Sequence, residues 1–457
     1  MGLTPLINAC SFQQYQAKPI DKSAINARLQ AKDPNGPQFR QYLLDNGYPN
    51  GNLPIQQWGA EELVYAALFF NPDLDVARAQ LRAAELAKSI AGIRNVPTVS
   101  GNIAHSNQAN GDIRPYAIGL SIDIPIETAN KRDIRIDNAT HLSEIAKLEI
   151  AQAAWQLRNR VTETFYAYQV NQRLISLLQN EQASRQEIVA IYQKRFNLGA
   201  ASNSELSTAK LQLLNTQSEL VAKQQEKLTL LARLASNLGL PMEKVRAMSI
   251  IDSPSFIAPN LPAENAKTAA LLNRLDIRIA LERYALAEAK LKLEIAKQYP
   301  DISLNPGYAY EFGDKIWSLG ISSLLSLLEK NKAAIAEAEQ LREVEAAQFE
   351  ALQTKVITEA SIASSQLNQA QQLLSNQQQL EEQQSANAQR TQRRFNAGDA
   401  DRLEVAFSRL ETNAVEKNVL LAQAQQLTAL VQLENALQRP LIESDKSKNL
   451  TDPVIKN

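Results

Sequence analysis

Very few residues in this chain are of the types that carry out catalysis or bind metal ions. The 457 residues include two histidines, His105 and His141, and a single cysteine, Cys10. A structural zinc site takes four ligands, mostly Cys and His, and a cysteine nucleophile needs a histidine to activate it. One thiol also closes no disulfide within a chain. With no nucleophile motif, Gly-rich phosphate loop or metal-ligand spacing, the sequence predicts a protein that is not an enzyme and binds no cofactor or metal.

Cys10 is the residue whose neighbours indicate a chemical modification. Ile7-Asn8-Ala9 precede it, so a branched apolar residue lies three positions before the cysteine and a small residue directly before it. This spacing is similar to the lipobox at which bacterial lipoproteins are cleaved and acylated. No basic region and no full apolar region of a signal peptide precede it. We expect residues 1–10 to be a truncated signal and Cys10 to carry the lipid; the alternative is a chance free thiol.

An arginine-containing motif occurs twice and reveals a duplication. Arg195-Phe196-Asn197-Leu198-Gly199 recurs 199 residues later as Arg394-Phe395-Asn396-Ala397-Gly398. An acidic residue follows each glycine by six positions, as Glu205 and Glu404. Offsets of 199 to 201 residues also relate Leu74-Asp75-Val76 to Leu275-Asp276-Ile277, Asn130-Lys131 to Asn331-Lys332, and Pro241 to Pro440. The sequence therefore predicts two tandem copies of one structural unit.

Each unit is expected to consist mainly of very long helices. Apolar residues recur every three or four positions along two stretches, from about Asn130 to Phe196 and from about Asn331 to Phe395, and neither contains Pro or Gly. Helices of this length would be rods of roughly 100 Å. Gly199 and Gly398 are expected to end them at the position after the C-cap. The remaining helices are expected at Pro72–Ile93, Leu275–Gln298, from Gly199 to about Leu238, and from Gly398 to about Gln438.

Between the helices lie four segments in which large apolar and small or polar residues alternate. They are Val99–Ile103, Tyr116–Ile124, Ile302–Tyr310 and Trp317–Ile321. A period of two predicts β-strands, and polar turns pair them into two hairpins. The hairpins are either soluble and packed on the helices, or membrane strands with one face toward lipid.

Membrane strands in this number require more than one copy of the chain. Four strands close no barrel, since the smallest membrane barrels have eight, and an open sheet edge in lipid leaves backbone groups unsatisfied. Two copies supply eight strands and three supply twelve. The alternate positions are small or polar, which suits a wet interior and favours three copies: Ala117, Gly119, Ser121, Ser303, Asn305, Ser318 and Gly320.

The net charge and the length of the apolar runs argue against two further kinds of protein, nucleic-acid binders and proteins with membrane-spanning helices. There are 48 Lys and Arg and 49 Asp and Glu, a formal net charge of −1, which excludes the broad positive field of a dedicated nucleic-acid binder. The longest apolar candidate, Val64–Phe70, is too short to span a bilayer and predicts a buried helical turn.

The duplicated order of helix, β-hairpin and long helical hairpin, with Arg-Phe-x-x-Gly at each turn, resembles the TolC-type outer-membrane efflux channels. Ile124-Pro125-Ile126-Glu127, followed by Asn130-Lys131-Arg132, is similar to that family's strand-to-helix turn. The resemblance covers about residues 56–440. The second unit departs from the pattern, with Ser326-Leu327 in place of Pro125-Ile126, so we expect a less sharp bend there.

The resemblance implies a fold, a location and partners. The fold would be mainly α with a membrane portion, in which a homotrimer closes twelve strands into one β-barrel that continues as a periplasmic α-barrel. The chain would be the exit channel of a tripartite efflux pump, working with a periplasmic adaptor and an inner-membrane transporter. Lipoprotein relatives of the CusC type are anchored at an N-terminal cysteine. Ser11, rather than Asp, follows Cys10 and fits sorting to the bacterial outer membrane.

Two other functions remain open, and the exported substrate is undetermined among drugs, metal ions and proteins. A type I protein-secretion exit duct has the same fold, and a non-channel structural coiled-coil protein would also contain long helices. The expected divisions are a signal and lipobox at 1–10, an N-terminal periplasmic flank at 11–71, the first repeat at 72–241, a linker at 242–270, the second repeat at 271–440 and a polar tail at 441–457.

The two helical-hairpin turns are expected to form the periplasmic tip that contacts the adaptor. The residues expected to make that contact are Arg195, Phe196, Gly199, Ser202, Arg394, Phe395 and Gly398. By the resemblance, Glu404 stands where such channels have an acidic constriction, and Asp401 lies one turn away, so both are candidates for a periplasmic gate. The structural alternative is helix capping, since Ser202–Glu205 and Asp401–Glu404 both fit a capping box.

Overall fold

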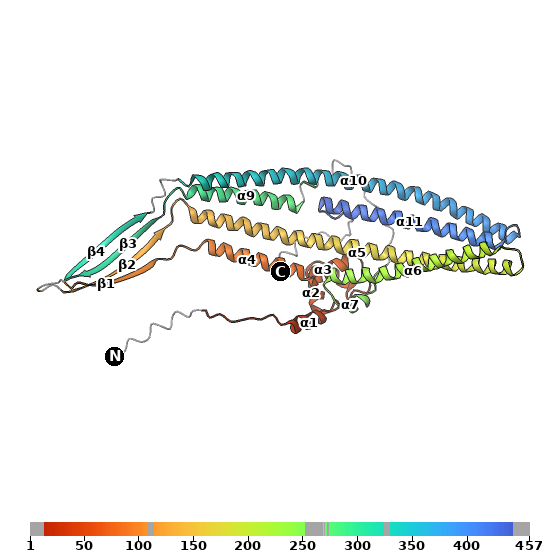
Figure 1. The fold of residues 1–457 in the computed structure, drawn as a ribbon, viewed down its shortest axis with the longest axis horizontal. Coiled ribbons are helices and arrows are strands. Elements are labelled where there is room, and N and C mark those ends of the chain that lie inside the picture. Colours follow the sequence, from red (N-terminus) through yellow and green to blue (C-terminus); the bar gives the residue numbers. More distant parts are fainter. Residues whose placement is uncertain are drawn as a thin grey trace.

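The computed structural model describes residues 13–107, 111, 114–251, 268, 270–271, 274–323 and 330–441. Figure 1 shows an elongated arrangement with a small β-sheet at one end, two helical-hairpin turns at the other, and short helices beside the middle. The predicted combination of long helices with a four-stranded sheet is confirmed.

Six helices form the length of the molecule, three from each half of the chain. The first half contributes α4 (Pro72–Ala91), α5 (Lys131–Asn197) and α6 (Asn203–Leu238), and the second α9 (Leu275–Ala296), α10 (Lys332–Ala397) and α11 (Arg402–Leu437). The rods α5 and α10 have 67 and 66 residues, or roughly 100 Å each at 1.5 Å per residue. The long helices were predictable because neither rod contains a residue that breaks a helix.

The four strands form one antiparallel sheet in the order β1-β2-β3-β4. Their bounds are β1 (Thr98–His105), β2 (Tyr116–Ile126), β3 (Ile302–Glu311) and β4 (Asp314–Ser323). The two predicted hairpins are therefore joined side by side, with Ser121 of β2 opposite Gly307 of β3. The edges of the sheet are β1 and β4.

The helices lie side by side in an order that matches the sheet. Helix α4 packs on α5, α5 packs on α9, and α9 packs on α10, while α11 contacts both rods. Strand β1 and helix α4 thus lie on one flank of the molecule, and strand β4 and helix α10 lie on the other (Figure 1). Within the described residues, no helix carries an apolar stretch long enough to cross a bilayer.

A small aromatic core packs against the middle of α5 and the C-terminal end of α6. Its helices are α2 (Pro37–Asp45), α3 (Ala60–Phe70) and α7 (Met242–Arg246), while α1 (Lys22–Gln30) and the 3₁₀ turn η2 (Asn50–Asn52) precede or connect them and bury no residue. Phe39 stacks on Trp58 and lies tilted against Phe70 there. Seven of the eleven residues of α3 are buried, which confirms the buried turn predicted at 64–70.

Parts of the expected linker and tail are also placed. Val245 of α7 is fully buried in the aromatic core, so the start of the segment expected as a linker is folded. Residues 252–267 of that linker and residues 442–457 of the tail lie outside the described residues.

Candidate functional site

One face of the sheet is apolar and exposed, and we call it the apolar face. Ile103 lies opposite Ile118, Leu120 opposite Tyr308, and Tyr308 opposite Trp317, so large side chains continue from strand to strand. Trp317 is 79% exposed, and Ile103 also 79%. An exposed apolar surface of this continuity marks a site of contact with lipid or protein.

The opposite face carries small or polar residues, and we call it the small-residue face. Ser121 lies opposite Gly307, and Gly307 lies opposite Ser318. Because side chains alternate along a strand, these residues all point away from the apolar face. Of the alternating residues named from the sequence, all lie on this small-residue face: Ala117, Gly119, Ser121, Ser303, Asn305, Ser318 and Gly320.

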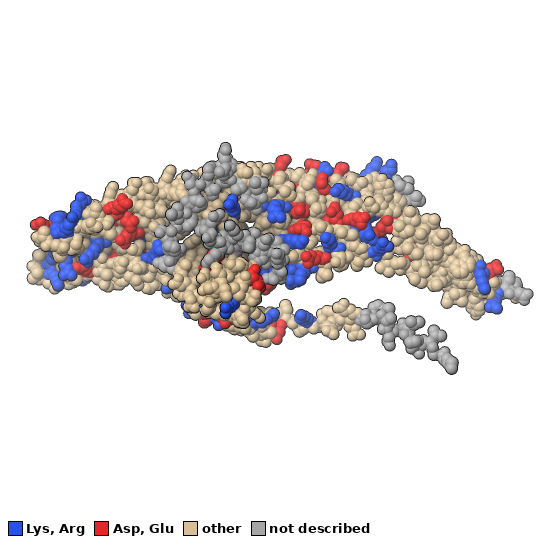
Figure 2. All heavy atoms as spheres, turned by 180° about the vertical axis from the view of Figure 1, so that it is seen from behind, with Lys and Arg blue, Asp and Glu red and all other residues tan. Residues whose placement is uncertain are grey.

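Charged residues of the sheet are concentrated at the end where β3 turns into β4. Figure 2 shows a band without Lys, Arg, Asp or Glu over much of the sheet, with charges at its far end. The far end carries Arg114, Glu311, Asp314 and Lys315. Within the strands, Asp123 lies on the small-residue face, and its Oδ1 atom is buried without a hydrogen-bond partner among the described residues. An apolar band bounded by charge is typical of a surface that crosses a bilayer.

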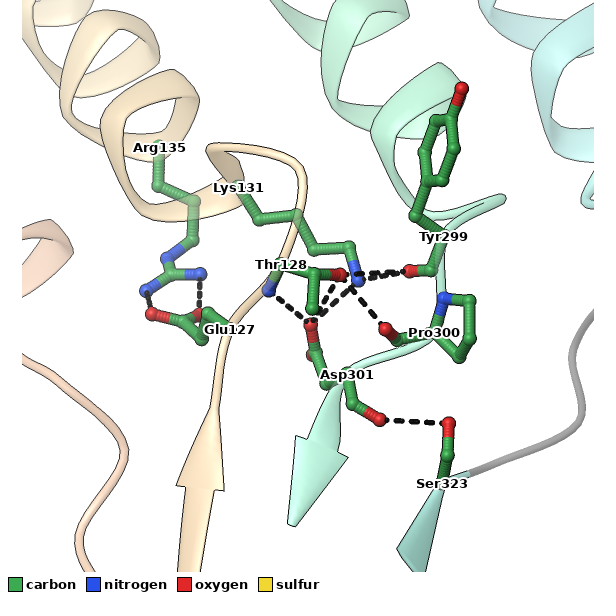
Figure 3. Close-up of polar contacts among 8 residues, drawn as sticks. All are labelled: Glu127, Thr128, Lys131, Arg135, Tyr299, Pro300, Asp301 and Ser323. Atoms are coloured by element: carbon green, nitrogen blue, oxygen red, sulfur yellow. Dashed lines mark hydrogen bonds and ion pairs between the residues drawn. The ribbon is translucent and has the colours of Figure 1, made fainter. Parts of the chain in front are cut away.

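The strand-to-helix turn at the base of β2 joins the two halves of the chain (Figure 3). Lys131, the first residue of α5, is buried and donates hydrogen bonds to the backbone oxygen of Tyr299 at 2.5 Å and to Oδ1 of Asp301 at 2.7 Å. Thr128 adds bonds from its backbone N–H to Asp301 and from its hydroxyl to the carbonyl of Pro300. The first rod is thereby fixed to the loop between α9 and β3.

The backbone of this turn has an uncommon conformation that recurs at the second rod. Ala129 and Asn130 have positive φ angles of 54° and 56°, and Lys330 and Asn331 have 52° and 49°. Arg135 forms two hydrogen bonds with Glu127 across the first turn. Two successive left-handed residues reverse the direction of the chain, and this conformation precedes both rods.

At the opposite end, both hairpin turns close with the same hydrogen-bond pattern. Ala200 N–H donates to the carbonyl of Arg195, and Asp399 N–H donates to that of Arg394. Gly199 and Gly398 adopt φ angles of +71° and +87°, as the left-handed position of a Schellman motif requires. The glycines predicted to end the rods are therefore explained by helix termination.

The two arginines of the tip hold carboxylates. Arg195 lies 2.7 Å from Asp401 on the other hairpin, and Arg394 lies 2.5 Å from Glu404 in its own hairpin. The backbone N–H of Glu404 and then the Arg195 guanidinium lower the pKa of Asp401, since both stabilise its charged form. Phe196 and Phe395 beside them are 40% and 37% exposed. The candidate gate and the candidate adaptor contact are thus one cluster.

The helix starts after the turns differ from the sequence prediction in one half. Ser202 and Glu205 form the full capping box at α6. At α11, Asp401 accepts a hydrogen bond from the Glu404 N–H at 2.7 Å. The Glu404 side chain accepts from Arg394 rather than from the backbone N–H of Asp401, so the capping box is not completed. An aspartate cap is already negative, so a second carboxylate gains more from the guanidinium than from the cap.

Other residues that hold the tip together carried no recognisable motif. Glu187 of α5 accepts from Arg402 at 2.6 Å and from Arg409 at 3.3 Å, both on α11. Beneath them an apolar cluster joins the hairpins and consists of Ile188, Ala209, Leu403 and Ala406. These contacts link helices from the two repeats, so no local sequence pattern reports them.

Two further predictions concern positions that the structure does not describe. Cys10 and its lipobox lie outside the described residues, and so does the Ser326-Leu327 departure before α10. Among the described residues, no group of three or more His, Cys, Asp or Glu side chains is arranged to hold a metal ion.

Comparison with known sequences gives a family and two informative relatives. The chain matches the sequence profile described as outer membrane efflux protein over residues 63–240 and 268–438. It is 25% identical over 433 residues to the pyoverdine export outer membrane protein OpmQ of Pseudomonas putida, covering 84% of this chain and 88% of OpmQ. It is 24% identical over 255 residues to the cobalt-zinc-cadmium resistance protein CzcC of Cupriavidus metallidurans, covering 54% of this chain and 59% of CzcC. The match to CzcC thus spans about three fifths of that relative's length.

Solved structures show the same fold. The outer-membrane channel OprN superposes with a TM-score of 0.69 at 21% identity, covering 84% of this chain and 90% of OprN. The outer membrane protein VceC of Vibrio cholerae gives 0.68 at 18% identity, covering 84% and 96%, and CusC gives 0.68 at 18%, covering 83% and 92%. The arrangement of long helical hairpins on a small sheet is therefore that of known outer-membrane channels.

Proposed function

This chain belongs to the outer membrane efflux protein family, and from that membership we propose that it is the outer-membrane exit channel of a tripartite efflux pump. The family and the fold are those of channels and not of enzymes. The channel would conduct passively, taking substrates from an inner-membrane transporter through a periplasmic adaptor.

The observation that carries this proposal is a sheet with two open edges and an apolar outer face. Strands β1 and β4 have unpaired edges, and the apolar face between them is continuous. In lipid, each unpaired backbone group costs several kcal/mol, so a membrane sheet must close on itself. The chain closes its sheet by joining other copies, with β4 of one copy pairing with β1 of the next.

The helices support the same closure, because both flanks carry apolar residues that are exposed among the described residues of a single chain. On one flank the exposed side chains are Val76, Leu86 and Ile90 of α4, Ile93 just after it, and Leu211, Leu214, Val221 and Leu228 of α6. On the other they are Leu341, Val344, Ile362, Leu373 and Leu380 of α10. Burial of such stripes contributes about 25 cal/mol for each Å² removed from water, which favours contact between the two flanks of neighbouring copies.

Three copies fit the small-residue face better than two. Eight strands enclose an interior that side chains fill, whereas twelve leave room for a pore. The small-residue face offers hydroxyl, amide and methyl groups along the sheet, which suit a water-filled passage. We therefore propose a homotrimer with twelve strands and an α-barrel of roughly 100 Å beneath them.

The relatives inform the cargo. OpmQ is named for pyoverdine export and CzcC for cobalt, zinc and cadmium resistance. Both names denote small solutes, which favours small-molecule efflux for this chain over type I protein secretion. In this proposal Cys10 anchors the channel to outer-membrane lipid, and the hairpin turns meet the adaptor.

Asp401 and Glu404 take part in the proposal as gate residues whose charge is balanced. Three copies would place three Asp401–Arg195 and three Glu404–Arg394 pairs around the opening. A ring of free carboxylates would favour cations strongly, whereas paired carboxylates give a weaker field until the pairs open.

Membrane fractionation and bilayer recording test the proposed channel. The protein, expressed with a full signal sequence, should separate with outer membranes, migrate as a trimer that heating dissociates, and give ion conductance in planar bilayers. A monomer in the soluble fraction would overturn the channel assignment. Trimers without conductance would leave only a structural role.

A further inference from the structure

A single offset of 201 residues relates β2 and the turn after it to β4 and the turn after it. Tyr116-Ala-Ile-Gly-Leu-Ser in β2 corresponds to Trp317-Ser-Leu-Gly-Ile-Ser in β4, 201 residues later. The same 201 residues separate the paired left-handed turns at Asn130 and Asn331. The even strands and the helices that follow them are therefore related by one constant offset.

A second offset relates the odd strands, and two observations give it independently. His105 of β1 lies opposite Tyr116, while Tyr308 of β3 lies opposite Trp317, so His105 corresponds to Tyr308, 203 residues later. Pro97 and Pro300 precede these strands and are also 203 residues apart. The agreement means that the β1–β2 and β3–β4 hairpins are equivalent in register.

Because β4 is equivalent to β2 and β1 is equivalent to β3, the observed β2–β3 pairing predicts how β4 of one copy pairs with β1 of the next. Within the chain, Ser121 lies opposite Gly307 and Leu120 opposite Tyr308. Adding 201 to a residue number in β2 gives the equivalent residue of β4, and subtracting 203 from one in β3 gives the equivalent residue of β1. The two pairs then become Ser322–Ala104 and Ile321–His105. We propose that neighbouring copies join through β4 and β1 with Ser322 opposite Ala104 and Ile321 opposite His105. This inference rests on the ring of copies proposed above and specifies its seam.

The faces of the sheet agree with this seam register. Ser322 and Ala104 both belong to the small-residue face, and Ile321 and His105 both belong to the apolar face. A slip of one residue would place the apolar residues of one strand on the small-residue face of the other. The left-handed turns at Asn130 and Asn331, and Pro97 with Pro300, lie outside the strands and have the same two offsets, so the agreement of the faces does not depend on the alternating residues alone. Slips of two residues keep the faces and are the competing registers.

The turn into the second rod adds a contact at the same seam. Lys131 is bound by the carbonyl of Tyr299 and the carboxylate of Asp301. The two offsets convert Lys131 to Lys332, Tyr299 to Val96 and Asp301 to Thr98. Lys332 is exposed in a single chain, and in the seam it would face the Val96 carbonyl and the Thr98 hydroxyl of the next copy. The hydroxyl replaces a carboxylate, so this contact lacks an ion pair that the junction within the chain has.

Disulfide cross-linking tests the register directly. A Cβ built on Gly307 would lie 3.5 Å from the Cβ of Ser121, within the range that a disulfide spans. The Ser322→Cys with Ala104→Cys variant, made in a full-length Cys10→Ser chain and oxidised in outer membranes, should therefore form covalent dimers and trimers on non-reducing gels.

Shifted and internal pairs provide the controls. Ser322→Cys with Asn102→Cys, and Ser322→Cys with Ser106→Cys, place the thiols two residues out of register in opposite directions, where Cβ atoms are about 7–8 Å apart, and should cross-link about tenfold less. Ser121→Cys with Gly307→Cys closes within one chain and should remain a monomer on denaturing non-reducing gels.

The outcomes distinguish an error in the proposed β4–β1 register from a failure of the proposed ring of copies. Stronger cross-linking of a shifted pair would overturn the proposed register while leaving a β4–β1 ring. If no pair links copies, although thiol titration shows that the internal control oxidises and the trimer persists before heating, β4 and β1 do not form the seam. If the trimer itself is missing, the proposed channel fails as well.

Discussion

At the scale of single residues, Arg195 at the hairpin tip forms an ion pair with Asp401 that the Arg-Phe-x-x-Gly motif alone does not predict. The repetition of Arg195 and Arg394 predicts them as adaptor contacts, and in the structure each also binds a carboxylate that the sequence indicates as a candidate gate residue. Arg195 joins the two hairpins, whereas Arg394 stays within its own. Their replacement will therefore alter the tip itself before any partner is considered.

Reversing the charge of Arg195 should loosen the hairpin tips. Arg195→Glu places a carboxylate beside Asp401, and like charges at this distance repel. We expect faster hydrogen exchange in the last turns of α5 and the first of α11, and weaker cross-linking to the adaptor. The double variant Arg195→Glu with Asp401→Arg restores opposite charges and should recover the exchange protection. If adaptor cross-linking also recovers fully in the double variant, the adaptor does not require a positive charge at position 195.

Neutralising Glu404 should change ion selectivity. Glu404→Gln removes the partner of Arg394 and leaves a positive charge in each copy near the opening. We expect reduced preference for cations and weaker block by divalent ions in planar-bilayer recordings. Glu205→Gln is the matched control, because Glu205 closes a helix cap and carries no such pairing with Arg394. Unaltered selectivity in Glu404→Gln would remove the gate proposal and leave a structural ion pair.

Lipid attachment at Cys10 is a separate prediction for one residue. In a chain with a full signal sequence, Cys10→Ser should abolish labelling by a palmitate analogue. The trimer should persist, since strand pairing and helix packing hold the copies together in the proposal. Acyl labelling that survives in the variant would refute the assignment.

At the scale of elements, the parts that were predictable are those with a local signal. Helix α5 follows from a three-to-four residue apolar period and from the absence of Pro and Gly, and β2 follows from a period of two. Pairing of β2 with β3 joins residues such as Ser121 and Gly307 that are far apart in sequence, and the Arg195–Asp401 contact spans 206 residues. Such contacts depend on how the repeats pack, which no short pattern encodes. Of the aromatic core at α2 and α3, the sequence likewise predicts only the buried helical turn at Val64–Phe70.

Removing Lys131 should destabilise the junction between sheet and helices. Lys131→Met leaves the Tyr299 carbonyl and part of the Asp301 carboxylate without a partner, which we expect to cost about 2 kcal/mol. The expected result is a lower unfolding temperature and faster hydrogen exchange at the start of β3. Lys332→Met, at the corresponding exposed position, should leave the chain's own fold unchanged and lower only the temperature at which copies separate. Equal effects on both measurements would argue against different environments for the two lysines.

At the scale of the whole molecule, the internal duplication makes each chain resemble two neighbours in a ring. Helix α5 packs on α9 within the chain, and the equivalent surface of α10 is exposed in the part of the chain that the structure describes. Contact between α10 of one copy and α4 and α6 of the next would repeat the packing between halves. The proposed assembly would thereby bury the long exposed stripes.

The α6 stripe provides the sharpest test of that assembly. Leu214, Val221 and Leu228 recur every seven residues and are 56%, 56% and 45% exposed. Val221→Glu would bury a charge against α10 of the next copy, which is strongly unfavourable without a partner, so we expect the heat-sensitive trimer to be lost while the helical circular dichroism is retained. Asn215→Glu, an exposed position outside the stripe, is the matched control and should assemble normally. A stable Val221→Glu trimer would mean that this stripe faces water or another partner, and the packing of α6 on its neighbour would have to be abandoned even if the strands close the ring.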